Sequence, residues 1–147
     1  MPIKLTGAAV AAGMAQLEVV KGYTVGEDIP AGSVVALRDT DGKIYQAQAS
    51  SWSRMPAIGV IQEDAVTDEE VDVYHYTPIS DIRRTEDFTA RDRIFVSTEA
   101  GKGTKTFPQT IGHIVQCIGY ALDSSDIALT VWKLWEEIDH TAIEIGG

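Results

Sequence analysis

Residues 27–37 read EDIPAGSVVAL, and residues 86–96 read EDFTARDRIFV. The two stretches lie 59 positions apart, and each leads from an acidic pair through a turn into a β-forming run. The same spacing relates Gly42-Lys43 to Gly101-Lys102. Matches that recur in one order at one spacing are typical of an internal repeat. The chain is therefore predicted to consist of two related halves.

Two further matches extend the repeat towards the end of each half. Ile58-Gly59-Val60 corresponds to Ile118-Gly119-Tyr120 at a spacing of 60. Each half then closes with an alternating strand, Val71–Tyr74 in the first and Leu129–Trp132 in the second. In the first of these strands, extended to residue 76, Val71 and Val73 are expected on one face with His75. We predict repeat units at residues 27–76 and 86–132.

The turn residues within each unit favour an all-β fold. Asp41-Gly42 is a strong hairpin signal, because glycine accepts the positive φ of a two-residue turn, and Ala100-Gly101 lies at the corresponding place. Gly59 and Gly119 each interrupt an apolar strand, which is typical of a bulge or sharp bend. Short strands separated by frequent turns predict a small β-barrel or a β-clip-like (β-tulip) module.

The ends of the chain differ in composition from the middle. Residues 1–16 are rich in small residues and lack a clear period, so we expect a flexible N-terminal arm. Residues 17–133 are predicted to form the β-barrel-like core, and residues 134–147 a C-terminal tail that is either one helical turn or extended. Trp132 and Trp135 are candidate interface aromatics. A helix would place them on one face and a strand on opposite faces.

Charge limits the classes of partner. The 147-residue chain has 12 Lys and Arg against 22 Asp and Glu, a formal net charge of −10. Such a surface repels phosphate backbones and anionic headgroups, so we expect neither nucleic-acid nor membrane binding. Residues 83–93 hold four arginines, but Glu86, Asp87 and Asp92 lie among them and indicate a mixed solvated surface. No signal peptide or membrane span is recognisable, which predicts synthesis in a cytoplasm.

No set of residues predicts catalysis, a cofactor or a metal centre. Cys117 is the only cysteine, so no intramolecular disulfide can form. His113 would lie roughly 13 Å from Cys117 along a strand, too far for a thiolate dyad. The acidic run at residues 63–72 lacks the calcium-loop pattern, and residues 101–105 lack the Walker pattern. We therefore predict that the chain is not an enzyme.

Four aromatic side chains could line a sugar or peptide groove, although core or interface packing is the more common role of such residues in small β proteins. They are Tyr74, Tyr76, Trp132 and Trp135.

The sequence resembles bacteriophage capsid decoration proteins, also called cement proteins, over roughly residues 23–132. The resemblance rests on the segments Ile29–Val35, Gly42–Ile44, Ala57–Val60 and Ile118–Ala121. It implies a small β-barrel or β-clip core that assembles as homotrimers on the outer capsid surface. It further implies binding to the major capsid protein after shell expansion, and stabilisation of the shell against internal pressure. The two-copy arrangement departs from the simplest single-domain decoration proteins.

The same resemblance implies that an N-terminal arm joins the shell protein by adding a strand. In this chain the arm residues are Pro2, Ile3, Lys4 and Leu5. Pro2 has no N–H and would mark the outer limit of such pairing, while Ile3 and Leu5 would share one face of the strand.

Two other classes remain open from sequence. One is a trimeric head-fibre or tail-associated virion protein with a glycan- or receptor-binding face, although the long stalk of such fibres is missing here. The other is an enzyme accessory domain of β-clip or hammerhead shape, which usually accompanies a larger catalytic chain.

Overall fold

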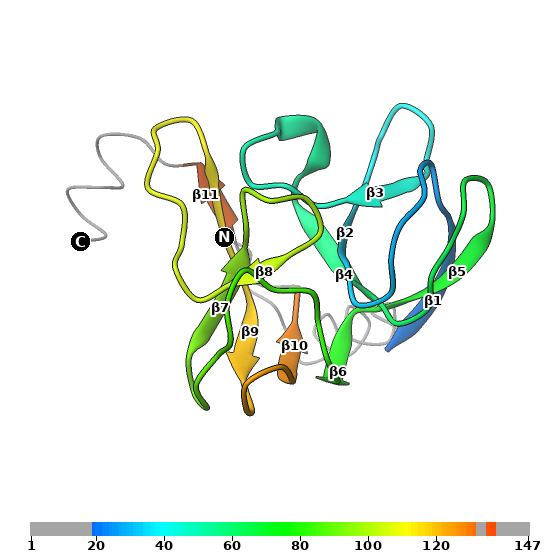
Figure 1. Cartoon of the computed structure of the whole chain (residues 1–147). Helices are drawn as coiled ribbons and strands as arrows, with labels where there is room; N and C mark the ends of the chain where they lie inside the picture. The colour runs from blue at the N-terminus through cyan, green and yellow to red at the C-terminus, as the bar shows by residue number, and fades with distance from the viewer. Residues whose placement is uncertain (1–18, 132–134, 138–147) are drawn as a thin grey trace, which may run out of the picture.

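Figure 1 shows the computed structural model, which describes residues 19–131 and the backbone of residues 135–137. The described residues contain eleven strands, one 3-10 turn and no α-helix. The first five strands are β1 (Val20–Thr24), β2 (Val34–Leu37), β3 (Ile44–Gln46), β4 (Ala57–Ile61) and β5 (Glu70–Tyr74), with the 3-10 turn η1 (Trp52–Arg54) before β4. The remaining strands are β6 (Tyr76–Ile79), β7 (Arg93–Val96), β8 (Gly103–Thr104), β9 (Ile114–Ala121), β10 (Ile127–Thr130) and β11 (Trp135–Glu137).

The strands form two antiparallel sheets with the same internal order, which confirms the predicted all-β class. The first sheet runs β1-β5-β4-β2-β3 and the second runs β6-β10-β9-β7-β8. Each strand of the first sheet therefore has a counterpart five strands later in the chain. In the view of Figure 1 the first sheet lies to the right and the second to the left.

Irregularities of the backbone recur at corresponding positions in both sheets. The register between β2 and β4 shifts after the pair Val35–Gly59, and the register between β7 and β9 shifts after Ile94–Gly119. A side chain at either glycine would overlap a backbone carbonyl oxygen of the neighbouring strand. The interrupted apolar strands are thus bulges at which the bare glycine backbone allows close approach.

Each sheet curls until its two edges meet at one parallel bridge. Val25, just after β1, bridges to Ile44 of β3, and Arg84, after β6, bridges to Gly103 of β8. Both members of the second bridge lie 59 positions after those of the first. The strand pairing between the described residues therefore gives two curled sheets, one in each half.

Three details of the predicted repeat need correction. The segment 71–76 is not one strand, because β5 ends at Tyr74 and β6 begins the second sheet at Tyr76. Each unit also includes an earlier strand, β1 or β6, that the sequence matches missed. Finally, Val73 pairs with Ile61, and Ile127 pairs with Ala121 at the corresponding end of β9, so Val73 corresponds to Ile127. The predicted match of residues 71–74 to residues 129–132 is therefore four residues out of register.

The buried side chains form two clusters. The smaller cluster lies inside the first sheet and includes Val35, Ile44 and Val73. The larger one joins the interior of the second sheet, including Ile94 and Ile118, to the other face of the first sheet. The first half supplies Val34, Ala36, Ala57 and Val60 from β2 and β4, and Ala47, Ala49 and Met55 from the β3–β4 connection. Because these residues belong to the same cluster as Ile94 and Ile118, the halves share one core.

Strand β11 continues along β9 beyond β10, with Trp135 opposite Gln116 and Glu137 opposite Ile114. This pairing shows that residues 135–137, predicted to belong to a helical or extended tail, are extended. Within residues 19–131 and 135–137, no helix is long and apolar enough to cross a membrane.

Candidate functional site

The two halves are clamped together by a buried glutamine. Gln116 lies in β9 at 1% exposure, between Ile114 and Ile118 on the inward face of the strand. Its Oε1 accepts a hydrogen bond from the Ala57 N–H at 2.6 Å, and its Nε2 donates to the Ala57 carbonyl at 2.9 Å. The side-chain amide therefore satisfies both backbone groups of a buried residue in the other half, as a neighbouring strand would.

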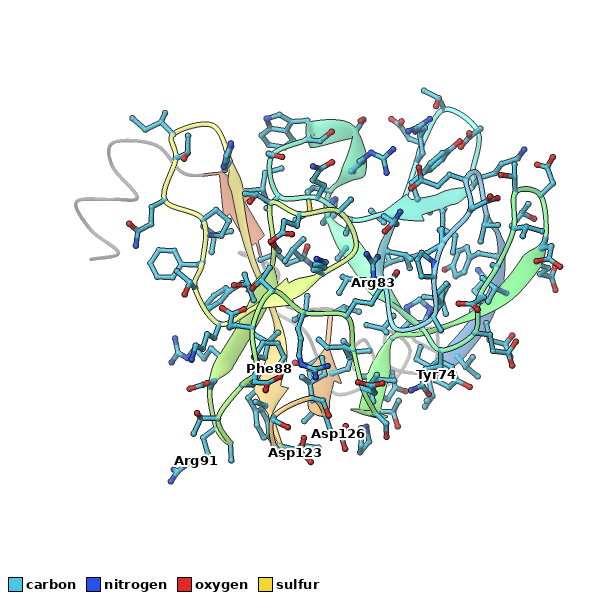
Figure 2. All side chains as sticks on the ribbon, viewed as in Figure 1. Tyr74, Arg83, Phe88, Arg91, Asp123 and Asp126 are labelled. Atoms are coloured by element: carbon cyan, nitrogen blue, oxygen red, sulfur yellow. The ribbon has the colours of Figure 1, made fainter. Side chains whose placement is uncertain are left out.

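An arginine forms a second polar connection in the middle of the molecule (Figure 2). Nη1 of Arg83 donates to Ser33 Oγ at 2.9 Å and to Gln46 Oε1 at 2.6 Å. The Arg83 N–H donates to the Gly32 carbonyl at 2.9 Å. These acceptors are neutral and come from the first half, so Arg83 orients the turn before β2 against the second half.

Backbone hydrogen bonds complete the junction. The Val34 N–H donates to the Gly101 carbonyl at 2.9 Å, and the Gly101 N–H donates to Ala47 at 2.8 Å. Gly101 has φ +76° and is buried, and a side chain there would press against Arg83 Nη1 at 2.7 Å. The predicted hairpin glycine of the second half is therefore also a contact residue of the first half.

The segment between β3 and β4 is held by a bidentate ion pair. Arg54 Nη1 lies 2.7 Å from Glu27 Oε2, and Nη2 lies 3.0 Å from Oε1. Burial would raise the pKa of Glu27, but hydrogen bonds from Arg54 and the Gln46 N–H outweigh it and lower the pKa below its usual range. The pair ties η1 to the segment between β1 and β2.

The residues tested for thiol and histidine chemistry are separated by the fold. The Cys117 thiol, on β9, donates to the Gly119 carbonyl at 3.4 Å. His113 lies in the turn before β9, where its N–H bonds the Thr110 carbonyl. His75 joins the two sheets, and its Nδ1 lies 2.7 Å from the Ile58 carbonyl. Each of these three residues thus makes a hydrogen bond to a backbone carbonyl in the described part of the chain.

The acidic run after β4 bonds to neighbouring loops. Asp64 accepts from the Ala31 N–H at 2.8 Å, and Asp68 pairs with Lys43 at 2.8 Å. Among the described residues, no three His, Cys, Asp or Glu side chains are grouped so as to hold a metal ion. These carboxylates tie the connections of the first half to one another.

Of the predicted interface residues, Pro2, Ile3, Lys4, Leu5 and Trp132 lie outside the described residues, as does the side chain of Trp135. Tyr74 is half-buried and packs against the larger core cluster (Figure 2).

Sequence analysis missed the junction residues Gln116 and Arg83. A signal existed for Gln116, because strand alternation places it on the same face as two buried isoleucines. Arg83 had no such signal, since its acceptors come from distant parts of the chain.

No protein-family model matches the sequence, and no curated protein matches it at a significant level.

Proposed function

We propose that this chain is a structural virion protein that binds the outer surface of a bacteriophage capsid and stabilises the expanded shell. The observation that carries the proposal is the position of the motifs that resemble decoration proteins. Gly32 precedes β2 with φ +83°, Gly42 lies in the β2–β3 hairpin with φ +70°, and Gly59 forms the bulge of β4. The motifs thus occupy the turns and bulge on which the curled sheet depends.

Recurrence of this framework in the second half supports the same proposal. Gly101 and Gly119 occupy the corresponding turn and bulge. The polar clamps at Gln116 and Arg83 join the halves into one core, which suits a protein that must resist mechanical load. A formal charge of −10 suits the outside of a shell, away from packaged DNA.

The proposed role is non-catalytic and needs no cofactor. Its partners are the major capsid protein and further copies of the chain, as a homotrimer on the shell. Residues 1–16 would contribute by adding a strand to an exposed sheet edge of the shell protein. Many copies on one symmetric shell would give avidity, so each contact can be modest.

Expanded phage shells prepared without this protein provide the test. The purified chain is mixed with expanded and unexpanded shells, sedimented, and imaged by cryo-electron microscopy. We expect co-sedimentation with expanded shells only, density at threefold and quasi-threefold positions, and a higher temperature of shell disruption.

Absence of binding to expanded shells would refute the proposal. Density confined to a portal vertex or tail would instead support a head-fibre or tail-associated protein, the other virion role considered from sequence.

A further inference from the structure

The repeat places corresponding residues on the outward face of each sheet. Three cross-strand pairs of the first sheet, Val34–Val60, Ala36–Ala57 and Val60–Tyr74, recur in the second as Arg93–Tyr120, Phe95–Cys117 and Tyr120–Ala128. Residues directly opposite each other in an antiparallel pair project from the same face, as do residues two positions apart in one strand. Each set of five residues therefore lies on one face of its sheet.

The two faces differ in burial. In the first sheet the four aliphatic members are at most 3% exposed, and Tyr74 packs against the cluster that they share with the second half. In the second sheet Tyr120 is 50% exposed, Arg93 is exposed, and the other three members are half-buried. Phe107, itself 44% exposed, extends this surface, because its ring lies 5.5 Å from that of Phe95. The open face is our name for Arg93, Phe95, Cys117, Tyr120 and Ala128.

The open face carries a positive charge. Strands β7, β9 and β10, which supply it, contain no Asp or Glu, and Arg93 forms no ion pair with any residue in the described part of the chain. Carboxylates stand at its margins, where Glu86 accepts a hydrogen bond from Thr104 of β8 at 3.1 Å and Glu136 of β11 pairs with Val115. A partner that presents an acidic group can therefore pair with Arg93.

In the first half, the corresponding face is covered with the help of a hairpin. Gly101, in the β7–β8 hairpin, is buried, accepts from the Val34 N–H and donates to the Ala47 carbonyl. Its counterpart in the β2–β3 hairpin, Gly42, is exposed, and a side chain there would meet nothing within 4 Å. The Gly42 N–H bonds the Arg38 carbonyl of its own hairpin. The β2–β3 hairpin is thus the counterpart of a hairpin that seats on such a face, but among the described residues it has no such seat.

Charges on the β2–β3 hairpin complement the open face. Asp39 is exposed in its turn and makes no ion pair within residues 19–131. Of the two hairpin cations, Lys43 pairs with Asp68 at 2.8 Å, and the Arg38 guanidinium lies 3.5 Å from the centroid of the Tyr45 ring. Arg93 takes the position of Val34, to which Gly101 is bonded. A β2–β3 hairpin seated in the same way would therefore bring Asp39 towards Arg93.

We propose that the open face binds the β2–β3 hairpin of a second copy of this chain, head to tail, with Asp39 of that copy opposite Arg93. This inference rests on the proposed function for the number of copies, three. A head-to-tail contact joins two different surfaces and forms a ring when the rotation between copies closes. Each copy of the trimer would contribute one hairpin and one open face. Because both surfaces exist in the free chain, the contact should form without a shell.

Charge reversal tests the pairing of Arg93 with Asp39. Arg93→Glu, Asp39→Arg and the double variant are compared by sedimentation equilibrium of the free chain, after circular dichroism and urea titration have verified folding. Arg91→Glu is the matched control, because it makes the same change of charge at an exposed arginine that Figure 2 shows at the lower left tip of the molecule. We expect each single variant to self-associate about tenfold more weakly, since like charges then face each other, and the double variant to recover most of the loss. Arg91→Glu should associate as the unsubstituted chain does.

Disulfide trapping tests which surfaces meet. In a Cys117→Ser background, Arg93→Cys and Asp39→Cys are introduced separately and together, and the oxidised free protein is run on non-reducing gels. Only the variant with both new cysteines should give covalent dimers and trimers. Cross-linked dimers from Arg93→Cys alone would show that the open face meets itself, and would overturn the head-to-tail contact.

The remaining outcomes separate this contact from shell binding. A free chain that sediments as a monomer at every concentration and forms no cross-links would overturn the inference while leaving the decoration role intact. Failure of the double charge reversal to associate better than the single variants would overturn it too. Weaker binding of Arg93→Glu to expanded shells with self-association unchanged would assign the open face to the shell instead. If the chain self-associates as expected but binds no expanded shells, the decoration role fails and the contact between copies stands.

Discussion

Replacing Gln116 with leucine tests whether the two halves unfold as one cooperative unit. The side chain is 1% exposed, and Ala57, whose N–H and carbonyl it satisfies, is 3% exposed. Leucine has a similar volume but cannot bond either group. Because each buried polar group left without a partner costs about 1–3 kcal/mol, we expect the loss of both partners to lower the free energy of unfolding by about 2–6 kcal/mol.

The loss should be measurable by urea titration followed by circular dichroism. Since domains of this size have about 5–15 kcal/mol of stability, the variant should remain folded at low temperature. Its melting temperature should fall by roughly 2–4 °C for each kcal/mol lost. Gln62→Leu is the matched control, because the Nε2 of Gln62 makes an exposed 3.3 Å bond to the Ser80 carbonyl.

If Gln116→Leu lowers the free energy of unfolding no more than Gln62→Leu does, the reasoning is refuted, since the backbone groups of Ala57 would then not depend on the hydrogen bonds from Gln116. Two separate unfolding transitions in the unsubstituted chain would refute the more general claim that the halves share one core.

Three further substitutions and one truncation follow from the same structure. Gly119→Ala should cost about 3 kcal/mol or more, because φ is +152° and the new methyl group would overlap the Ala128 carbonyl oxygen. Gly42→Ala, with φ +70° and nothing within 4 Å, should cost only about 1–2 kcal/mol in the same titration. Arg54→Gln should destabilise the protein more at pH 7 than at about pH 3. Because the fold lowers the pKa of Glu27, the ionised carboxylate stabilises the protein at pH values above the usual carboxyl pKa, and this contribution disappears as the carboxylate is protonated at lower pH. An equal loss at both pH values would contradict the role of the ion pair. Deleting residues 1–16 should change the free energy of unfolding by less than about 0.5 kcal/mol while weakening shell binding, and loss of folding would show that these residues belong to the core.

Local chemistry explains how much of the fold could be predicted. Gly42 marks a turn and Gly59 marks a bulge through local backbone geometry, so the repeat could be predicted from the sequence without knowing which strands pair. The last strand of each half was misaligned because the connections before it differ in length. Twelve positions separate Ile61 from Val73, but six separate Ala121 from Ile127, and no property of an individual residue indicates such a difference.

The junction was less predictable because it depends on how the two sheets face each other. Alternation along β9 does place Gln116 inward, but only the packed structure shows that Ala57 is its partner. Arg83 depends still more on the fold, since Ser33 and Gln46 lie 50 and 37 positions away in sequence. Polar contacts at such separations follow from tertiary structure and not from spacing.

The division of the core shows why two similar halves make one domain. The first sheet encloses a cluster of its own, built around Val35, Ile44 and Val73. The interior of the second sheet is instead continuous with the junction, where Ile94 and Ile118 share a cluster with Val34. In the second half, Gly103 stands where the first half has the bridging Ile44, and the side chains of Ile82, Ile94 and Phe88 fill the space over it. Because the interior of the second sheet is continuous with the junction, the second half depends on the first for part of its apolar burial, and the first half alone would expose the face that carries Val34. Each half needs the other, and so a force applied to either one is shared by a single core.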